Sequence, residues 1–124
     1  MTMDARPSVL VVDDHAGFRA MARKVLEAAG FFVMEASNGV DATEIARDLL
    51  PSLVLLDVQL PGIDGFEVAR RLATYENGPV VVLTSTREMS DYGDRVTSSP
   101  VAGFLPKDQL SPAVLQKYLK RDRR

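Results

Sequence analysis

Leu-Val-Leu-Leu-Asp at residues 53–57 is the stretch that decides the fold, because four apolar residues lead without interruption into a carboxylate. Similar apolar runs stand at residues 9–12 (Val-Leu-Val-Val) and 80–83 (Val-Val-Val-Leu). Continuous β-branched and leucine runs of this length are typical of strands buried on both faces, as in parallel sheets. Residues 32–34 and 102–105 are weaker strand candidates, and we expect them at the edges of the sheet.

Between these runs the apolar residues change to helical spacing. One such stripe starts at Phe18 and is closed by Gly30, and a second covers residues 42–49 ahead of Pro51. Residues 86–100 should also hold a helix, but the glycine and the Ser-Ser-Pro sequence in this stretch predict a short or irregular one.

Two further helices carry start motifs. Asp64-Gly-Phe-Glu67 resembles a capping box at the start of an apolar stripe at residues 66–73. Ser111-Pro112 supplies a cap and a first-turn proline for the last helix. Strand and helix therefore alternate about five times, which predicts an open, doubly wound α/β fold with a parallel sheet and helices on both faces. The active crevice of such a sheet lies at the carboxyl ends of its strands.

The composition of the chain excludes several classes of function. The chain has 124 residues, of which 46% are hydrophobic, so that we expect one soluble domain with a core of its own. The absence of cysteine excludes disulfides and thiol chemistry, and with a single histidine we expect no zinc site. A net charge of −2 gives no electrostatic case for nucleic-acid binding. No apolar run is long enough to span a membrane and residues 1–7 do not resemble a signal peptide, so we expect a cytoplasmic protein.

Polar residues follow the apolar runs, at the expected carboxyl ends of the strands. They are Asp13 and Asp14 after the first run, Asp57 after the third, Thr84 and Ser85 after the fourth, and Lys107 after the fifth. Two carboxylates about 5 Å apart repel each other by about 3 kcal/mol at an effective dielectric constant near 20. One lysine cannot neutralise three carboxylates, so we expect a hard dication with oxygen ligands, and Mg²⁺ is typical of such sites.

The same residues suit phosphoryl transfer. A carboxylate can act as a nucleophile and carry a phosphoryl group as a mixed anhydride. Such a transfer needs positioning and charge neutralisation more than it needs a general base. Asp57 stands alone at the end of the middle run, so we predict that it is the acceptor, with Asp13 and Asp14 on the metal. Lys107 and the Thr84 hydroxyl can each hold a phosphoryl oxygen.

Each residue taken alone also has a simpler explanation. Asp13 and Asp14 suit the positive end of a helix dipole, and Thr84 has good strand propensity. Phe104 can be a core residue, a switch residue or both. His15 is a helix-start residue for which a ligand role stays open. The basic end at residues 120–124 is either a solvated terminus or the start of a linker to an output domain.

Four motifs in this order resemble the receiver domains of two-component response regulators. They are Val-Val-Asp-Asp-His at residues 11–15, Leu-Leu-Asp-Val-Gln-Leu-Pro-Gly-Ile-Asp-Gly at 55–65, Val-Val-Leu-Thr-Ser at 81–85, and Gly-Phe-Leu-Pro-Lys at 103–107. The resemblance covers about residues 8–119, and it implies a single receiver domain over residues 1–124. It also implies the flavodoxin-like strand order 2-1-3-4-5 of the chemotaxis regulators.

The resemblance implies a role for each matching residue. Asp57 would be the phosphoacceptor. The Mg²⁺ ligands would be Asp14, Asp13 (mainly through water), Asp57 and the backbone carbonyl of Gln59. Lys107 would pair with the phosphoryl group, and Thr84 and Phe104 would form the switch. Phe104 stands where tyrosine is frequent in the family.

The implied function is a signalling switch rather than an enzyme. A sensor histidine kinase or a phosphotransfer protein would donate the phosphoryl group. The changed face, made by the fourth helix, the fifth strand and the last helix, would then bind a downstream protein or a second copy as a homodimer. No nucleic acid or membrane partner is expected.

Three alternatives compete with this function. A degenerate receiver would serve as a binding module without phosphorylation, and Mg²⁺-dependent modification of Asp57 discriminates it. An aspartyl phosphohydrolase usually has a second carboxylate two residues after its nucleophile, where Gln59 stands here. A flavodoxin-like cofactor binder needs a phosphate-binding loop after the first strand, where Asp13 and Asp14 would repel phosphate.

Overall fold

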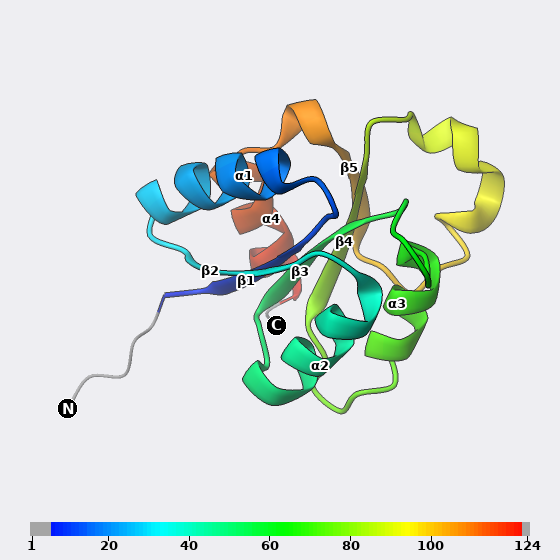
Figure 1. The fold of residues 1–124 in the computed structure, drawn as a ribbon, viewed down its shortest axis with the longest axis horizontal. Helices are drawn as coiled ribbons and strands as arrows, with labels where there is room; N and C mark the ends of the chain where they lie inside the picture. The colour runs from blue at the N-terminus through cyan, green and yellow to red at the C-terminus, as the bar shows by residue number, and fades with distance from the viewer. Residues whose placement is uncertain (1–5, 123–124) are drawn as a thin grey trace.

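The computed structural model describes residues 6–122 and shows a five-stranded parallel sheet between two layers of helices (Figure 1). The strands are β1 (Ser8–Val12), β2 (Phe32–Ala36), β3 (Leu53–Asp57), β4 (Val80–Ser85) and β5 (Gly103–Pro106). Their order is β2-β1-β3-β4-β5, which confirms the predicted order and places β2 and β5 at the edges.

Helices cover both faces of the sheet, as predicted. They are α1 (Ala16–Ala28), α2 (Gly39–Leu49), α3 (Gly65–Leu72) and α4 (Pro112–Asp122), with two short 3₁₀ segments, η1 (Met89–Arg95) and η2 (Lys107–Gln109). The helices α1 and α4 pack on one face, and α2 and α3 pack on the other (Figure 1).

The central strands are buried on both faces because their side chains alternate between two apolar layers. In β1, Val9 and Val11 pack with residues of α1 and α4, whereas Leu10 and Val12 pack with residues of α2 and α3. All four side chains are buried. This explains why the sequence of the central strands is continuously apolar rather than alternating.

The predicted helix starts are confirmed by their hydrogen bonds. The Asp64 carboxylate accepts from the backbone N–H of Glu67 at 3.0 Å. The Ser111 hydroxyl accepts from the backbone N–H of Val114 at 3.2 Å. Each bond satisfies an amide that lacks a partner within its own helix, which fixes where α3 and α4 begin.

The stretch at residues 86–100 is as irregular as predicted. It forms only η1, in which none of the residues is buried. Gly93 interrupts the segment with a φ of 62°, in the left-handed region that glycine adopts without strain. The fourth helix of the predicted output face is therefore a kinked 3₁₀ segment rather than an α-helix.

The ends of the chain limit what the structure tests. Residues 1–5 and 123–124 lie outside the described range, so the interpretation of the first residues and of the last part of the basic end is not tested. Within residues 6–122 none of the helices combines the length and the apolar character that crossing a membrane requires.

Candidate functional site

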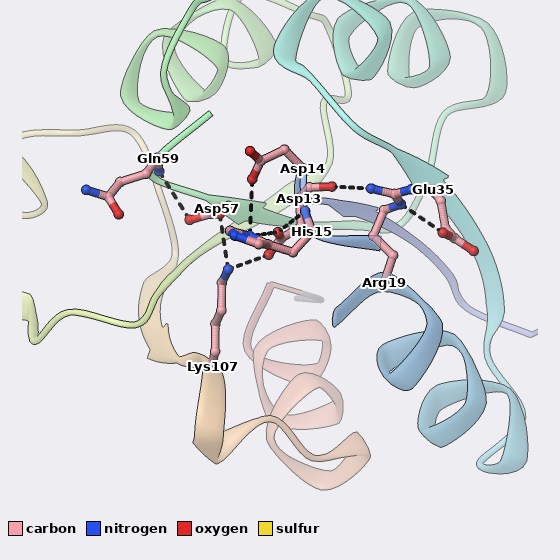
Figure 2. A network of polar contacts seen from close by, with 8 residues as sticks. All are labelled: Asp13, Asp14, His15, Arg19, Glu35, Asp57, Gln59 and Lys107. Atoms are coloured by element: carbon pink, nitrogen blue, oxygen red, sulfur yellow. Dashed lines mark hydrogen bonds and ion pairs between the residues drawn. The ribbon is translucent and has the colours of Figure 1, made fainter. Parts of the chain in front are cut away.

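The carboxyl ends of three strands bring the predicted charged residues together. Asp13 follows β1, Asp57 ends β3, and Lys107 follows β5. The Lys107 Nζ lies 2.6 Å from Asp13 Oδ2 and 3.1 Å from Asp57 Oδ2 (Figure 2). Asp13 and Asp57 are 0% and 3% exposed, so two carboxylates and one ammonium are held together away from solvent.

Asp57 is fixed by backbone contacts on the loop that follows it. The backbone N–H of Gln59 donates to Asp57 Oδ1 at 3.1 Å, and the Gly65 N–H donates to the Val58 carbonyl at 2.8 Å. A Cβ on Gly65 would collide with the Asp57 carbonyl, so only glycine lets α3 start this close to the end of β3. Burial raises the pKa of the Asp57 carboxyl; the Gln59 N–H and Lys107 oppose this shift without cancelling it.

Lys107 is the counter-charge of the site. Burial alone lowers the pKa of its ammonium, but the hydrogen bonds and charges of Asp13 and Asp57 outweigh burial, so that the pKa is raised. The Nζ also lies 5.0 Å from the centre of the Phe18 ring, within the range of a cation–π contact. Lys107 is therefore held in its charged form between two acids and an aromatic face.

A second network holds Asp13 in place through its backbone. Arg19 on α1 donates from Nη1 to the Asp13 carbonyl at 2.7 Å and from Nε to Glu35 Oε1 at 3.0 Å (Figure 2). Arg23 binds the other oxygen of Glu35 at 2.6 Å. These bonds lower the pKa of Glu35, with the Arg23 bond as the largest cause. The network ties α1, β2 and the Asp13 turn into one unit.

The donor set fits a divalent cation. Ligand atoms of Asp13, Asp14, His15 and Asp57 all lie within 4.8 Å of one another. Asp14 is 41% exposed, so the cluster is open to solvent on one side. Three carboxylates face one lysine, and the excess negative charge at these oxygen atoms is what a hard dication neutralises.

Thr84 and Ser85 differ in how their hydroxyl groups are satisfied. Thr84 pairs with Asp57 in the β3–β4 register, and its buried Oγ1 has no hydrogen-bond partner within residues 6–122. Ser85 Oγ lies 2.6 Å from the Tyr92 hydroxyl and accepts from the Arg87 N–H at 2.9 Å. Of the two, the Thr84 hydroxyl is thus the one left unsatisfied within residues 6–122.

Tyr92 is a residue that the sequence did not single out. Its ring packs edge-on against Phe66, with 5.8 Å between centroids, and in a tilted arrangement against Phe104, with 6.0 Å between centroids. Together with its bond to Ser85, these contacts connect the end of β4 to Phe104 on β5. The sequence lacked a signal for this role because η1 has no apolar periodicity to orient a side chain.

Gln59 and Phe104 are the remaining predicted site residues. The Gln59 side chain is exposed, which leaves its backbone as the part that faces the site. Phe104 is partly buried against Tyr92 and contributes no atom to the charged cluster.

A hollow of ≈ 530 Å³ opens beside Lys107. Its lining comprises His15, Phe18, Ser85, Thr86, Glu88, Pro106, Lys107 and Asp108.

Comparison with known proteins finds one family. The family model described as the response regulator receiver domain matches residues 9–120. The transcription regulator BvgA of Bordetella pertussis is 37% identical over 102 residues, which are 82% of this chain and 49% of BvgA. The sporulation initiation phosphotransferase F of Bacillus subtilis is 34% identical over 119 residues, covering 90% of this chain and 92% of the relative. The chain thus spans about half the length of BvgA and most of the phosphotransferase.

Solved structures agree with this result. The signal receiver domain of the response regulator NarL from Mycobacterium tuberculosis superposes with a TM-score of 0.83 at 32% identity, covering 95% of this chain and 98% of that domain. Receiver domains are signalling switches that bind Mg²⁺ at an acidic pocket and interact with histidine kinases and downstream effectors. The fold, the strand order and the family match agree, and the chain belongs to the response regulator receiver domain family.

Proposed function

We propose that this chain is the phosphoryl-accepting switch of a two-component system and that Asp57 is its acceptor. The observation that carries the proposal is the buried position of Asp57, with one carboxylate oxygen 3.1 Å from Lys107 Nζ and the other bound by the Gln59 N–H. Both contacts hold the carboxylate in one orientation, which is the positioning that phosphoryl transfer requires.

The donor in this proposal is a phosphohistidine of a sensor kinase or a phosphotransfer protein. An oxygen of Asp57 attacks the phosphorus, a P–O bond forms, and the P–N bond breaks with its electron pair returning to the donor imidazole, which carries a proton on its other ring nitrogen. The product is an acyl phosphate on Asp57 and a neutral histidine on the donor. Lys107 stabilises the charge on the phosphoryl oxygens, because its ammonium already lies at the Asp57 carboxylate.

The carboxylates of Asp13, Asp14 and Asp57 and the backbone carbonyl of Gln59 would hold Mg²⁺. The cation would supply positive charge to oxygens of the incoming group. Asp13 keeps Oδ2 on Lys107, so Oδ1, which accepts from the His15 N–H, is the oxygen left for the cation.

In this proposal the Thr84 hydroxyl and Phe104 transmit the effect of phosphorylation at Asp57 to the binding face. A phosphoryl oxygen on Asp57 gives the buried Thr84 Oγ1 the hydrogen-bond partner that residues 6–122 do not supply. Movement of Thr84 acts on its neighbour Ser85, which is bound to Tyr92, and Tyr92 packs on Phe104. The face made by η1, β5 and α4 then changes, and a downstream protein or a second copy binds it.

The direct test is the intact mass of the protein after incubation with a small-molecule phosphodonor, with and without Mg²⁺. We expect a mass gain of one phosphoryl group, and we expect this gain to require Mg²⁺. Mild base treatment, which cleaves an acyl phosphate, should remove the added mass. The Asp57→Asn variant should gain none. A folded wild-type protein that gains no mass under any condition would instead support a binding module that works without phosphorylation.

The Thr84→Val variant tests the relay. We expect it to raise the free energy of unfolding by about 1 kcal/mol, because it removes a buried hydroxyl without a partner. In the wild type, the phosphoryl analogue beryllofluoride with Mg²⁺ should shift the ring NMR resonances of Tyr92 and Phe104. In Thr84→Val these shifts should fall by at least half.

Thr74→Val is the matched control for the relay test. Thr74 is exposed and its hydroxyl donates to the Arg71 carbonyl at the end of α3, away from the site. It should leave the ring shifts of Tyr92 and Phe104 unchanged. Full ring shifts in Thr84→Val would show that the Thr84 hydroxyl is not the link.

A further inference from the structure

His15 stands at the start of α1 but does not cap the helix. Residues at this position usually have a short side chain with an oxygen that accepts from the first helical amides. His15 makes no such cap hydrogen bond. Its Nδ1 lies instead 3.1 Å from Asp13 Oδ1 and 3.2 Å from Asp14 Oδ1 (Figure 2). The Nδ1–Asp13 contact has the length of a hydrogen bond, and the backbone N–H of His15 also donates to Asp13 Oδ1 at 2.9 Å, so the ring is held at the carboxylates rather than at the helix start.

The spacing of these atoms, which is that of hydrogen bonds, also matches that of neighbouring ligands on one cation. Two ligand atoms at right angles, each about 2.1 Å from an octahedral ion, are about 3.0 Å apart. The two distances from the imidazole nitrogen to the carboxylate oxygens are close to this value. Nδ1 also lies within 4.8 Å of an Asp57 oxygen, so one ion can reach all four residues.

We propose that His15 is a nitrogen ligand of this cation site, so that the site also takes imidazole-binding divalent cations such as Ni²⁺. Oxygen ligands suit Mg²⁺, whereas an imidazole favours the later first-row metals. The His15 side chain is 69% exposed, so an ion from solvent can reach its nitrogen without a change in the core. The inference rests on the proposed cation site and adds a ligand that decides which cations it prefers.

The composition of the chain makes a direct test feasible. His15 is the only histidine and there is no cysteine, so an imidazole signal on a bound metal must come from this residue. Proton NMR of the untagged chain with Ni²⁺ should show a far-shifted imidazole ring C–H resonance, which does not exchange with solvent. The resonance should be absent from His15→Ala.

Calorimetric titrations with Ni²⁺ and with Mg²⁺ measure the preference. We expect His15→Ala and His15→Gln to weaken Ni²⁺ binding by about 10- to 100-fold. Removal of a group that only supports a metal ligand costs this much, so removal of the ligand itself should cost at least as much. The ratio of the Ni²⁺ to the Mg²⁺ affinity should fall by at least about tenfold. Asp14→Asn, which removes a carboxylate ligand, should weaken the binding of both cations.

Two results would overturn the inference while leaving the proposed function intact. One is a wild-type spectrum without the far-shifted resonance at saturating Ni²⁺. The other is a His15→Ala variant whose affinities for Ni²⁺ and Mg²⁺ change by the same factor, with Mg²⁺-dependent phosphorylation of Asp57 retained. A wild-type protein that binds neither cation would overturn the inference together with the cation site.

Discussion

Lys107→Met is expected to accept phosphoryl groups about 100- to 1000-fold more slowly than the wild type, the loss that follows removal of one well-placed charge-stabilising donor. The side chain of Met has a similar length but no charge, so the phosphoryl oxygens lose the ammonium that lies 3.1 Å from Asp57. The rate is measured as the gain in intact mass with time at fixed phosphodonor and saturating Mg²⁺.

The same variant is expected to be less stable. Lys107 is the partner of two buried carboxylates, and removal of one member of a buried ion pair costs about 3–5 kcal/mol. Urea unfolding in the absence of divalent cations measures this loss. Mg²⁺ should restore part of the stability, because it replaces the missing positive charge.

Lys117→Met is the matched control for both measurements. Lys117 is exposed on α4, so its replacement removes the same charge from the chain without touching the site. It should leave the rate within about twofold and the stability within about 0.5 kcal/mol. If Lys107→Met behaves like this control, Lys107 has no role in phosphoryl transfer and the proposed chemistry is wrong.

Asp57→Asn is expected to make the metal-free protein more stable at neutral pH while it abolishes phosphorylation. Burial raises the pKa of Asp57 above its ordinary value of 3.8. A carboxyl with a higher pKa in the folded than in the unfolded chain contributes stability below about pH 4, and this contribution is lost as the pH rises through the folded pKa. At neutral pH the wild type carries this unfavourable charge and the asparagine variant does not.

The expected size of this effect is about 4 °C in melting temperature, which corresponds to about 1 kcal/mol for a domain of this length. The difference between Asp57→Asn and the wild type should be smallest near pH 4 and grow toward pH 7. Thermal unfolding in the presence of a chelator measures it. Saturating Mg²⁺ should reduce or reverse the difference, because it stabilises the wild type more than the variant.

Asp48→Asn is the control for the pH series. Asp48 is exposed on α2, so its replacement should not shift the melting temperature by more than about 1 °C at any pH. A lower melting temperature for Asp57→Asn than for the wild type at pH 7 would mean that the ion pair with Lys107 outweighs the burial of the Asp57 charge.

Most of the fold and the charged part of the site could be predicted because both depend on local patterns. The apolar run at residues 53–56 indicates a central strand by itself, and the residue after it must lie at the carboxyl edge of the sheet. Asp13 and Lys107 reach that edge for the same reason. In a parallel sheet, residues that follow different strands in the sequence therefore meet at one edge.

The other parts depend on contacts that a single sequence does not show. Tyr92 lies in η1, where Gly93 breaks the backbone and there is no periodic pattern to indicate which side chains face inward. The position of the His15 ring depends on the turn after β1, which local patterns do not fix. The predicted roles of Thr84 and Phe104 concern a change of state, and those stay predictions.

None of the residues of η1 is buried, although η1 belongs to the face that is proposed to bind a partner. Apart from Tyr92, whose ring packs on Phe66 and Phe104, its side chains add little to the core, so substitutions of the other residues should change the folding free energy only slightly. The charged cluster has no such freedom, since a change at Lys107 leaves two buried carboxylates without their counter-charge. In the proposed switch, the partner-binding face can therefore vary through the exposed residues of η1 while the charged cluster stays constant.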